Sequence, residues 1–497
     1  MPHIFIFAIM LKKIITTILL IFIVNFLFAQ HTFEKIISKV EDQVINQVVE
    51  DSEGNFVLVG RIHNIETSYA AGYIIKIDST GNVLQENIFQ QTDTNSCNFY
   101  NIHCFDDHYY ILGQRIFVYP DTTKIWFLIL NSSLEIENEK FLNILNNRWF
   151  SYMNSIIDTD SNFVIAGFTT REDSIQVYHN DPVFYKISMN GDSISSNFMN
   201  KPIKNRFAFD IIENFDSSAY YAFVSRFENS SAGQKLILNK NMDSINIQPI
   251  PLGIHDNYSP IILTDSSILL CGKGVPQQSA FYALNVFSIN DQTELIDYNH
   301  FKIEGDMHDH PSMYNGVSKN GDNIYVGGTS NFDYYNPFYS YNDSWFHLIK
   351  INPDITSIWE YWYGGDAYYH LYSILATNDG GCLLVGNRYD YETQDVERDI
   401  YILKVDEDGI VTWTQEIPLT EKQTIIYPNP GTSCLNIKTK LKNSTFELID
   451  FTGKIILRKE INSEIEQINT NNIPSGIYFY RIHDNEKIIE SGKWVKR

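Results

Sequence analysis

Residues 155–167 read SIIDTDSNFVIAG, which is an apolar segment, a polar turn and a second apolar segment that ends at Gly167. β-Branched and aromatic residues on both sides of a short polar turn are typical of a β-hairpin. The second segment recurs along the chain with a turn before it. The fold is therefore decided by a repeat rather than by one local pattern.

The repeated segment occurs seven times. The copies are NFVLVG (55–60), HYYILG (108–113), NFVIAG (162–167), AYYAFVS (219–225), SILLCG (267–272), NIYVGG (323–328) and GCLLVG (381–386). Their last residues are 47 to 58 residues apart. After a variable loop comes another apolar strand, a tight turn and a final strand, as in YIIKIDSTGNVLQENIF (73–89). The unit is a four-stranded antiparallel meander.

Seven four-stranded units predict an all-β fold, a seven-bladed β-propeller over residues 30–419 with about 54 residues per blade. Two stacked sandwiches or a β-solenoid are the rival architectures. The closure of the ring stays open at this point. Residues 34–38 resemble a fourth strand for blade seven, but residues 411–417 would give that blade a fourth strand of its own.

The composition changes at the motif YPNP (427–430), whose prolines enforce extended or turn backbone. Short strands with alternating polarity follow, at 435–439, 446–456, 476–482 and 493–497. Residues 420–497 are therefore predicted to form a small C-terminal Ig-like β-sandwich.

This tail resembles the type A C-terminal sorting domain of the type IX secretion system. The resemblance rests on four motifs in order, formed by Tyr427, Pro428, Asn429 and Pro430; by Asp450, Gly453 and Lys454; by Asn472, Ile473, Gly476 and Tyr478; and by Lys493 near the end. Ile473 stands where the family usually has Leu. The resemblance implies that the tail engages outer-membrane secretion machinery. It also implies a secreted or cell-surface location in a Gram-negative bacterium. An ordinary Ig-like sandwich used for binding is the alternative.

The N-terminus fits export. Lys12 and Lys13 precede an apolar stretch, residues 14–29, that ends in Leu-Phe-Ala. A basic segment, a short apolar core and a small residue at the cleavage point predict a signal peptide at residues 1–29. No permanent transmembrane segment is then expected after cleavage. A retained membrane anchor is the alternative.

Charge and cysteine content narrow the function classes. The net charge is −23, and residues 30–420 carry 23 basic against 51 acidic side chains, whereas residues 421–497 carry 12 against 9. Such an acidic body repels nucleic acid, so we expect no nucleic-acid partner. Five cysteines cannot all pair within the chain. Cys97 and Cys104 either form a local disulfide or stay free.

The loops after the second and fourth strands of each meander leave the same face. In blades five to seven these loops are rich in aromatic residues, Asn and Asp, which suits binding of a glycan or protein. We predict a binding or adhesion module with a possible ligand face formed by Asp333, Tyr334, Tyr335, Tyr339, His308, His310, Tyr389 and Tyr391. The alternative is that these aromatics only cover the blade edges.

No catalytic motif stands out. The chain has no nucleophile elbow, zinc-binding HExxH or P-loop, so we expect no catalytic residues, no cofactor and no enzyme activity. A secreted polysaccharide hydrolase or lyase is the alternative, because the many carboxylates allow a catalytic pair without singling one out. His308-Asp309-His310 resembles a metal site, and the turn 158–162 resembles a calcium loop. Neither has a complete ligand set, so no metal is predicted.

Overall fold

The computed structural model describes residues 31–497 apart from 64–68, 90–94, 118–121, 144–148, 173–177, 200–207, 225–232, 252–258, 277–279, 303–304, 306, 394–396, 412–423, 440, 442–443, 451–453 and 485–486. The described residues form strands, turns and loops without a helix. The chain divides into unit 1, residues 1–413, and unit 2, residues 414–497. The predicted signal peptide and the predicted boundary at residue 420 both lie outside the described residues.

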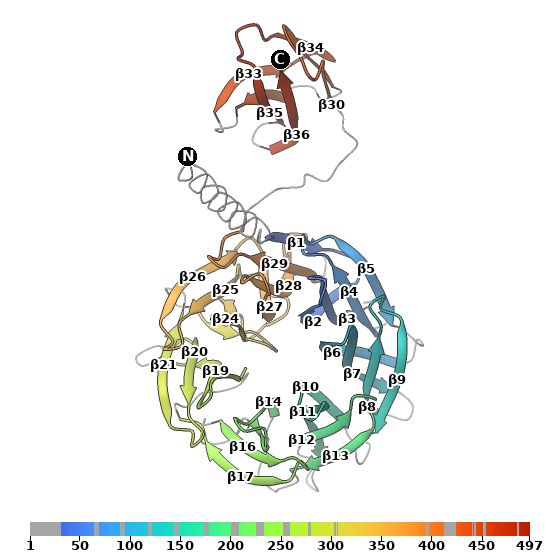
Figure 1. The fold of residues 1–497 in the computed structure, drawn as a ribbon, viewed down its shortest axis with the longest axis vertical. Coiled ribbons are helices and arrows are strands. Elements are labelled where there is room, and N and C mark those ends of the chain that lie inside the picture. Colours follow the sequence, from blue (N-terminus) through green and yellow to red (C-terminus); the bar gives the residue numbers. More distant parts are fainter. Residues whose placement is uncertain are drawn as a thin grey trace, which may run out of the picture. The chain divides into compact units, whose positions relative to one another are not determined.

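Unit 1 is a ring of seven antiparallel sheets, the blades, in the part of the chain that the structure describes (Figure 1). Blade 1 contains β2 (Asp42–Glu50), β3 (Phe56–His63), β4 (Ala70–Ile77) and β5 (Val83–Phe89). Blade 2 contains β6 (Asn95–Phe105), β7 (His108–Phe117), β8 (Thr122–Leu130) and β9 (Ile136–Asn143). Blade 3 contains β10 (Trp149–Ile157), β11 (Asn162–Glu172), β12 (Tyr178–Ser188) and β13 (Ser193–Phe198).

The remaining blades follow the same order. Blade 4 contains β14 (Ala208–Glu213), β15 (Ala219–Val224), β16 (Gln234–Asn239) and β17 (Ser244–Pro249). Blade 5 contains β18 (Ile261–Thr264), β19 (Ser267–Gly274), β20 (Ala283–Ile289) and β21 (Leu295–Phe301). Blade 6 contains β22 (Asp309–Pro311), β23 (Val317–Asn320), β24 (Asn323–Ser330), β25 (Trp345–Ile351) and β26 (Ser357–Gly364). Blade 7 contains β27 (Tyr368–Ala376), β28 (Cys382–Tyr389), β29 (Asp399–Val405) and β1 (Phe33–Ile37).

The outermost strand of blade 7 comes from the N-terminal side of the propeller. β1 pairs antiparallel with β29, with Phe33 opposite Lys404 and Ile37 opposite Ile400. The first of the two closure alternatives is therefore the observed one. The other, a strand at 411–417, falls mostly on residues outside the described part, and Val411 itself lies outside any strand. The pairing covers the edge of β29 that would otherwise be open.

The repeated glycine has a structural reason. Each of the seven predicted copies runs beside the innermost strand of its own blade and is the second strand outward from the axis. In blade 6 the innermost position is divided between β22 and β23, which both pair with β24. A Cβ on Gly60 would lie 1.9 Å from the Val44 carbonyl oxygen, and one on Gly386 would lie 2.2 Å from that of His370. Glycine is needed because the innermost backbone approaches too closely for a side chain.

A belt of polar side chains joins the innermost strands around the axis. The innermost strands of blades 1 to 3 each contain a β-bulge, followed by Gln47, Asn101 and Asn154. The Asn101 side-chain amide donates to the Asn154 oxygen (2.7 Å), and that of Asn154 donates to Asp210 Oδ1 (2.9 Å). Gln47 accepts the backbone N–H of Ile102 (2.8 Å). The belt thus links the innermost strands of blades 1 to 4.

Asp210 gives the belt a pH dependence. Burial raises the pKa of this carboxyl well above its ordinary value, so the folded state favours the protonated form. The contribution of the Asp210 carboxyl to the free energy of unfolding is fully present below the pKa of about 4 that it has in the unfolded chain. This contribution is lost as the pH rises through the pKa that the carboxyl has in the folded protein. Asp210→Asn keeps the acceptor used by Asn154 and Ile211 but cannot ionise.

We therefore expect Asp210→Asn to be more stable than the parent at pH 7.5, by about 1 kcal/mol or more, which is the scale of an incompletely compensated buried polar group. The gain should shrink toward zero near pH 4. Urea unfolding at both pH values measures it. A difference that does not change with pH would contradict the raised pKa of Asp210.

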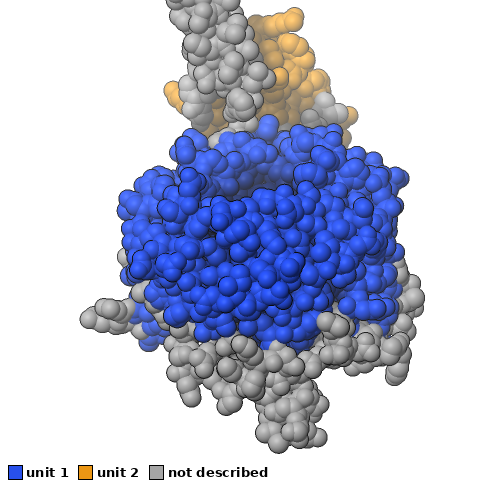
Figure 2. Space-filling view, turned by 60° about the horizontal axis from the view of Figure 1, so that its bottom comes forward, with its two compact units in different colours: residues 1–413 blue, residues 414–497 orange. Residues whose placement is uncertain are grey.

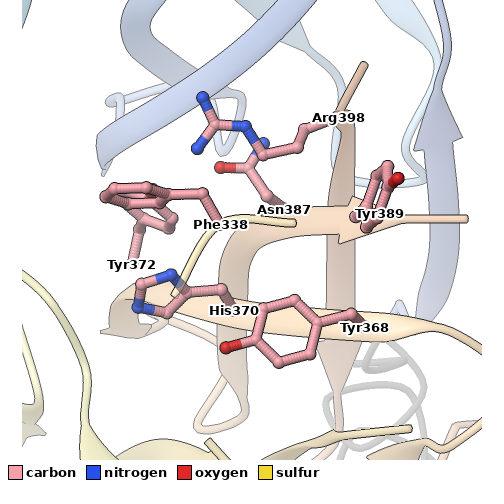
Figure 3. A pocket seen from close by; sticks show the side chains of 7 residues that line it. All are labelled: Phe338, Tyr368, His370, Tyr372, Asn387, Tyr389 and Arg398. Carbon is pink, nitrogen blue, oxygen red and sulfur yellow. The ribbon is translucent and has the colours of Figure 1, made fainter. Parts of the chain in front are cut away.

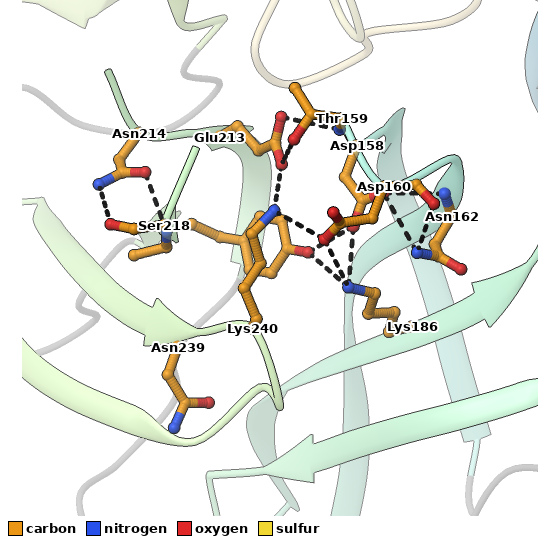
Figure 4. A network of polar contacts seen from close by, with 12 residues as sticks. Asp158, Thr159, Asp160, Asn162, Lys186, Glu213, Asn214, Ser218, Asn239 and Lys240 are labelled. Atoms are coloured by element: carbon orange, nitrogen blue, oxygen red, sulfur yellow. Dashed lines mark hydrogen bonds and ion pairs between the residues drawn. The ribbon is translucent and has the colours of Figure 1, made fainter. Parts of the chain in front are cut away.

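A network of polar contacts around a lysine connects blade 3 to blade 4 near the turns (Figure 4). Lys186 of blade 3 lies 2.9 Å from Asp158 Oδ2, and its ammonium donates to the hydroxyl of Tyr220 in blade 4 (3.0 Å). The Tyr220 hydroxyl also donates to Asp158 (2.6 Å). The Asp158 carboxylate is thus occupied by a lysine and a tyrosine, and it shapes its turn by accepting the Asn162 N–H. These contacts account for the turn that resembles a calcium loop.

Unit 2 is a β-sandwich. One sheet contains β30 (Thr424–Tyr427), β31 (Cys434–Thr439) and β34 (Ile465–Asn469); the other contains β33 (Ile455–Ile461), β32 (Ser444–Ile449), β35 (Gly476–Asp484) and β36 (Lys487–Lys496). Its core joins Leu435 and Ile437 of the first sheet to Phe446, Ile482 and Trp494 of the second.

All five cysteines are free. Cys97 and Cys104 lie near opposite ends of β6, and seven residues of extended strand span about 23 Å. A disulfide needs Cα atoms within about 7 Å, so the local disulfide considered above is wrong. Among the described residues, no helix has the length and apolar character needed to span a membrane.

Candidate binding face

The loops after the second and fourth strands of blade 6 do leave the same face. Ser330 at the end of β24 pairs with Trp345 at the start of β25, which pairs with Gly364 at the end of β26. We call this end of the ring the loop face. Its longest described loop is the blade 6 loop, residues 331–344.

Internal hydrogen bonds fix the shape of the blade 6 loop. Asp333 accepts the backbone N–H groups of Tyr335 (2.9 Å) and Asn336 (3.1 Å), together with the Ser340 hydroxyl (2.8 Å). Burial opposes ionisation of Asp333, but these donors outweigh it and lower the pKa. The Ser344 hydroxyl anchors the loop to the backbone of Tyr369 (2.7 Å). Asp333 therefore organises the loop.

The predicted ligand residues separate into exposed and buried sets. Tyr335 is fully exposed, at 102%, and Tyr391 is partly buried, with its hydroxyl donating to Asp343. Tyr389 is buried, and Tyr334 and Tyr339 are partly buried. Two aromatics that the sequence did not single out also reach solvent: Tyr341 is 73% exposed and Phe338 is 39% exposed. Their positions next to buried aromatics gave no signal in the sequence.

His308 and His310 flank the ring of Tyr334, at centroid distances of 5.2 and 5.6 Å. They share a face, as strand alternation predicts. His308 Nδ1 accepts the backbone N–H of Tyr282 (3.0 Å), and His310 stacks on Phe332 at 4.5 Å. The four rings form an aromatic cluster, to which the blade 6 loop contributes Phe332 and Tyr334. The described residues hold no group of three His, Cys, Asp or Glu side chains arranged for a metal.

Beneath the blade 6 loop, seven side chains meet: Phe338, Tyr368, His370, Tyr372, Asn387, Tyr389 and Arg398 (Figure 3). They leave no space large enough for a water molecule. Burial lowers the pKa of His370 well below its ordinary value, so this imidazole is neutral. The cluster is a support for the loop rather than a cavity for a ligand.

Arg398 connects this cluster to blade 1. Its Nε lies 2.8 Å from Asp42 Oδ1, and its Nη2 lies 2.6 Å from Asp42 Oδ2. Both side chains are buried, and the guanidinium lies about 5 Å from the ring centroids of Phe338 (5.1 Å) and Tyr339 (5.0 Å). This bidentate ion pair links the last blade to the first.

Tyrosines meet across the ring axis. The ring centroid of Tyr100 in blade 2 lies 6.2 Å from that of Tyr314 in blade 6. The ring centroid of Tyr314 lies 6.0 Å from that of Tyr372 in blade 7. Blades 2 and 6 are not neighbours, so these rings narrow the central channel. The space-filling view shows a hollow that opens into unit 1 (Figure 2). Tyr100 and Tyr372 are bulge residues of innermost strands, a role that their sequence context did not reveal.

A serine–histidine pair lies in the polar belt. His103 Nε2 is 2.8 Å from the Ser155 hydroxyl, but this hydroxyl donates to Asn101 Oδ1 at 2.6 Å. The serine proton is therefore directed at an amide oxygen and not at the imidazole, the reverse of an activated nucleophile. The pair fits a structural role.

In unit 2, the first and last segments of the predicted sorting motif form one structure. The Asn429 side-chain amide donates to the Lys493 carbonyl (2.8 Å), and the Trp494 indole donates to the Pro428 carbonyl (2.9 Å). Pro430 is exposed, Tyr427 is 38% exposed, and the Lys493 side chain is exposed. The two ends of the motif thus share one surface.

The middle motif residues are structural. Asp450 Oδ1 accepts the Lys454 N–H (3.1 Å) across a turn, and Gly453 lies outside the described residues. The Tyr478 hydroxyl donates to the Pro474 carbonyl (2.8 Å), and Gly476 pairs with Lys496. These contacts hold the turns that connect the strands.

Fold and motif geometry together define an all-β protein made of a β-propeller and a separate small β-sandwich. Residues 425–497 match the family model described as the secretion system C-terminal sorting domain, so the tail is a type IX secretion sorting domain. This finding bears on export and leaves the activity of the propeller open. A search of curated proteins found no match.

Several solved structures resemble this chain at low sequence identity. One is an acylaminoacyl peptidase from Pyrococcus horikoshii, with 11% identity and a TM-score of 0.42, covering 80% of this chain and 58% of that chain. Another is the β-propeller domain of the Trilobed protease from Pyrococcus furiosus, with 10% identity and a TM-score of 0.33. The match covers 80% of this chain and 92% of that chain. A protein of unknown function from Dyadobacter fermentans has 8% identity and a TM-score of 0.42. The match covers 60% of this chain and 92% of that chain. Such distant likenesses carry no argument about activity.

Proposed function

We propose that this is a secreted or cell-surface binding protein whose loop face, on blades 6 and 7, contacts an extracellular glycan or protein. The observation that carries the proposal is the pair Tyr335 and Tyr341, exposed by 102% and 73% on a loop whose backbone is fixed by Asp333. Large exposed aromatics on a rigid loop lose little conformational entropy on binding. They are also the residue type that dominates binding hot spots.

The acidic body favours a partner that is not a polyanion, because the field of 51 acidic side chains in residues 30–420 repels such partners. A neutral or mildly charged glycan, or a protein with a basic patch, meets this condition. Tyrosine rings stack on sugar faces and pack against protein side chains, so both partner types fit the exposed pair.

A non-enzymatic role is part of the proposal. It is supported by the Ser155–His103 pair, whose hydrogen bonds oppose nucleophile activation, and by the cluster under the loop, which leaves no cavity. The alternative, a polysaccharide hydrolase or lyase, predicts product release from a polysaccharide panel, whereas a binding protein retains the glycan unchanged.

We expect Tyr335→Ser/Tyr341→Ser to lower affinity for the partner at least tenfold, because each lost aromatic contact is worth about 1 kcal/mol or more. The effect is measured as binding of purified residues 31–497 to a glycan array and to proteins of the cell envelope. Tyr298→Ser is the matched control, since Tyr298 is 39% exposed on the outermost strand of blade 5. Equal binding by the parent and the double variant would contradict the assignment of the face.

A further inference from the structure

The two outer faces of the unit 2 sandwich differ in chemistry. Strand alternation places every second side chain of a sheet on its outer face. On the three-stranded sheet, the side-chain amide of Gln467 donates to the side-chain oxygen of Asn436 (3.0 Å), and Lys438 pairs with Ile465. On the four-stranded sheet, an apolar row of side chains lies beside a cationic row. We call this second surface the arginine face and define it by Ile449, Ile455, Phe479, Lys493, Arg458, Arg481 and Glu447.

The apolar row crosses all four strands. Ile449 of β32 pairs with Ile455 of β33 on one side and with Phe479 of β35 on the other. Phe479 in turn pairs with Lys493 of β36. Phe479 is 50% exposed and Ile455 is 38% exposed, whereas the neighbouring Tyr480 fills the core side of β35. Apolar side chains that gather on a surface, rather than standing singly, mark interaction sites.

The cationic row is built around one carboxylate. Glu447, which is 1% exposed, accepts hydrogen bonds from Arg458 Nε at Oε1 (2.7 Å) and from Arg481 Nε at Oε2 (2.5 Å). His483 Nε2 lies 3.5 Å from Oε1. The two arginine side chains nevertheless remain 63% and 39% exposed. A guanidinium has more N–H donors than these bonds use, so Glu447 holds each arginine in place while donors remain for a partner.

The charge of the arginine face favours an acidic partner. Its exposed cations are Arg458, Arg481 and Lys493, and the carboxylate of Glu447 is covered by the arginines. Glu460 lies two residues beyond Arg458 on the same side of β33. Cations therefore outnumber exposed carboxylates among the described side chains of this face. Opposite potentials speed association and exclude partners of like charge.

The family match indicates that the partner is a protein. Residues 425–497 match a secretion sorting domain, and this family implies recognition by machinery of the outer membrane. Aromatic and arginine side chains are enriched at protein interfaces, whereas lysine is depleted. The arginine face combines an aromatic side chain with two arginines. The strands of the other sheet, β30, β31 and β34, contain no arginine.

From these observations, we propose that the arginine face of unit 2 binds an acidic protein surface of the outer-membrane secretion machinery. Phe479 and Ile455 pack against apolar side chains of that partner, and the exposed cations pair with its carboxylates. The inference concerns unit 2 and is independent of the binding function proposed for the loop face of unit 1.

The test is export of Phe479→Ser/Arg458→Gln in the full chain, measured as the fraction of the protein found in the culture supernatant. We expect this fraction to fall about tenfold or more, because loss of an aromatic and an arginine contact within one interface weakens a complex on this scale. Glu447 keeps its contacts with Arg481 and His483, so the variant is expected to fold.

Ile465→Ser/Lys438→Gln is the matched control. It removes one apolar side chain, 52% exposed, and one exposed cation that are paired on the other outer face. We expect this control to be exported like the parent. Circular dichroism and urea unfolding of purified residues 31–497 verify that both double variants are folded.

Normal export of Phe479→Ser/Arg458→Gln, or an equal loss in the control, would overturn the inference. If Phe479→Ser/Arg458→Gln is unfolded, Lys493→Glu replaces it, because Lys493 lies in the apolar row and is not among the ion-pair partners of Glu447. Loss of export by folded Lys493→Glu supports the inference, and normal export overturns it.

Two further measurements distinguish a protein partner from other occupants of the arginine face. Purified residues 31–497 are mixed with vesicles of phosphatidylcholine and phosphatidylglycerol, and self-association is followed by sedimentation. The inference predicts neither vesicle binding nor self-association through this face. Vesicle binding that Phe479→Ser/Arg458→Gln removes would assign the face to anionic lipid, and self-association that it removes would assign the face to a second copy of the chain. Either result would overturn the inference.

Discussion

Asp42→Asn lowers the free energy of unfolding of unit 1 by about 3–5 kcal/mol, the range for breaking one side of a buried ion pair. Asp42 accepts three hydrogen bonds from Arg398: two from the guanidinium and one from the backbone N–H (3.0 Å). The Gln43 N–H in turn donates to the Arg398 carbonyl (3.0 Å). The substitution leaves a buried guanidinium without its charge partner at the junction of the first and last blades.

Urea unfolding of purified residues 31–497 measures this loss. Asp366→Asn is the matched control, because Asp366 pairs with Arg388 on the same face but is 69% exposed, and exposed pairs contribute about 1 kcal/mol or less. The double variant Asp42→Leu/Arg398→Met removes both charges and should recover part of the stability. Similar losses for Asp42→Asn and Asp366→Asn would show that the buried pair does not hold the ring.

Trp494→Ala is expected to unfold unit 2 and abolish export. The Trp494 side chain is fully buried in the sandwich core, and its indole donates to Pro428 of the opening motif. Replacing a buried tryptophan by alanine costs about 3–5 kcal/mol, a large share of the stability of a domain this small. Secretion assays on culture supernatant and circular dichroism of isolated protein measure the two effects.

Lys493→Ala separates folding from recognition in the same strand. The Lys493 side chain is exposed, whereas its carbonyl accepts the Asn429 hydrogen bond, which alanine retains. We expect this variant to fold normally. Loss of export with an intact fold would mark Lys493 as a contact of the secretion machinery. Normal export by Trp494→Ala would contradict a role for the folded tail.

The repeat made most of the propeller predictable. Each predicted copy is the second strand of a blade, because local polarity and turn residues report a hairpin directly. The strand that completes blade 7 was not predictable, since residues 34–38 and 411–417 both have strand character and only long-range pairing distinguishes them. The sorting tail was recognisable because its motif residues form turns and a docked N-terminal segment that few other residues can replace.

The binding face was predicted as a region and not residue by residue. Tyr334 and Tyr335 are adjacent and identical in type, yet one lies in an aromatic cluster and the other is fully exposed. Loop hydrogen bonds decide which side chain points outward, and sequence polarity does not report them.

The central claim is that unit 2 directs export and unit 1 binds the partner. Its most direct test measures export and partner binding for two variants side by side: Trp494→Ala, purified from the cell if it is not exported, and Tyr335→Ser/Tyr341→Ser. We predict that the tail variant stays in the cell but binds the partner as the parent does, and that the loop variant is exported but does not bind. Loss of binding in the tail variant with unit 1 still folded, or full binding by the loop variant, would contradict the claim.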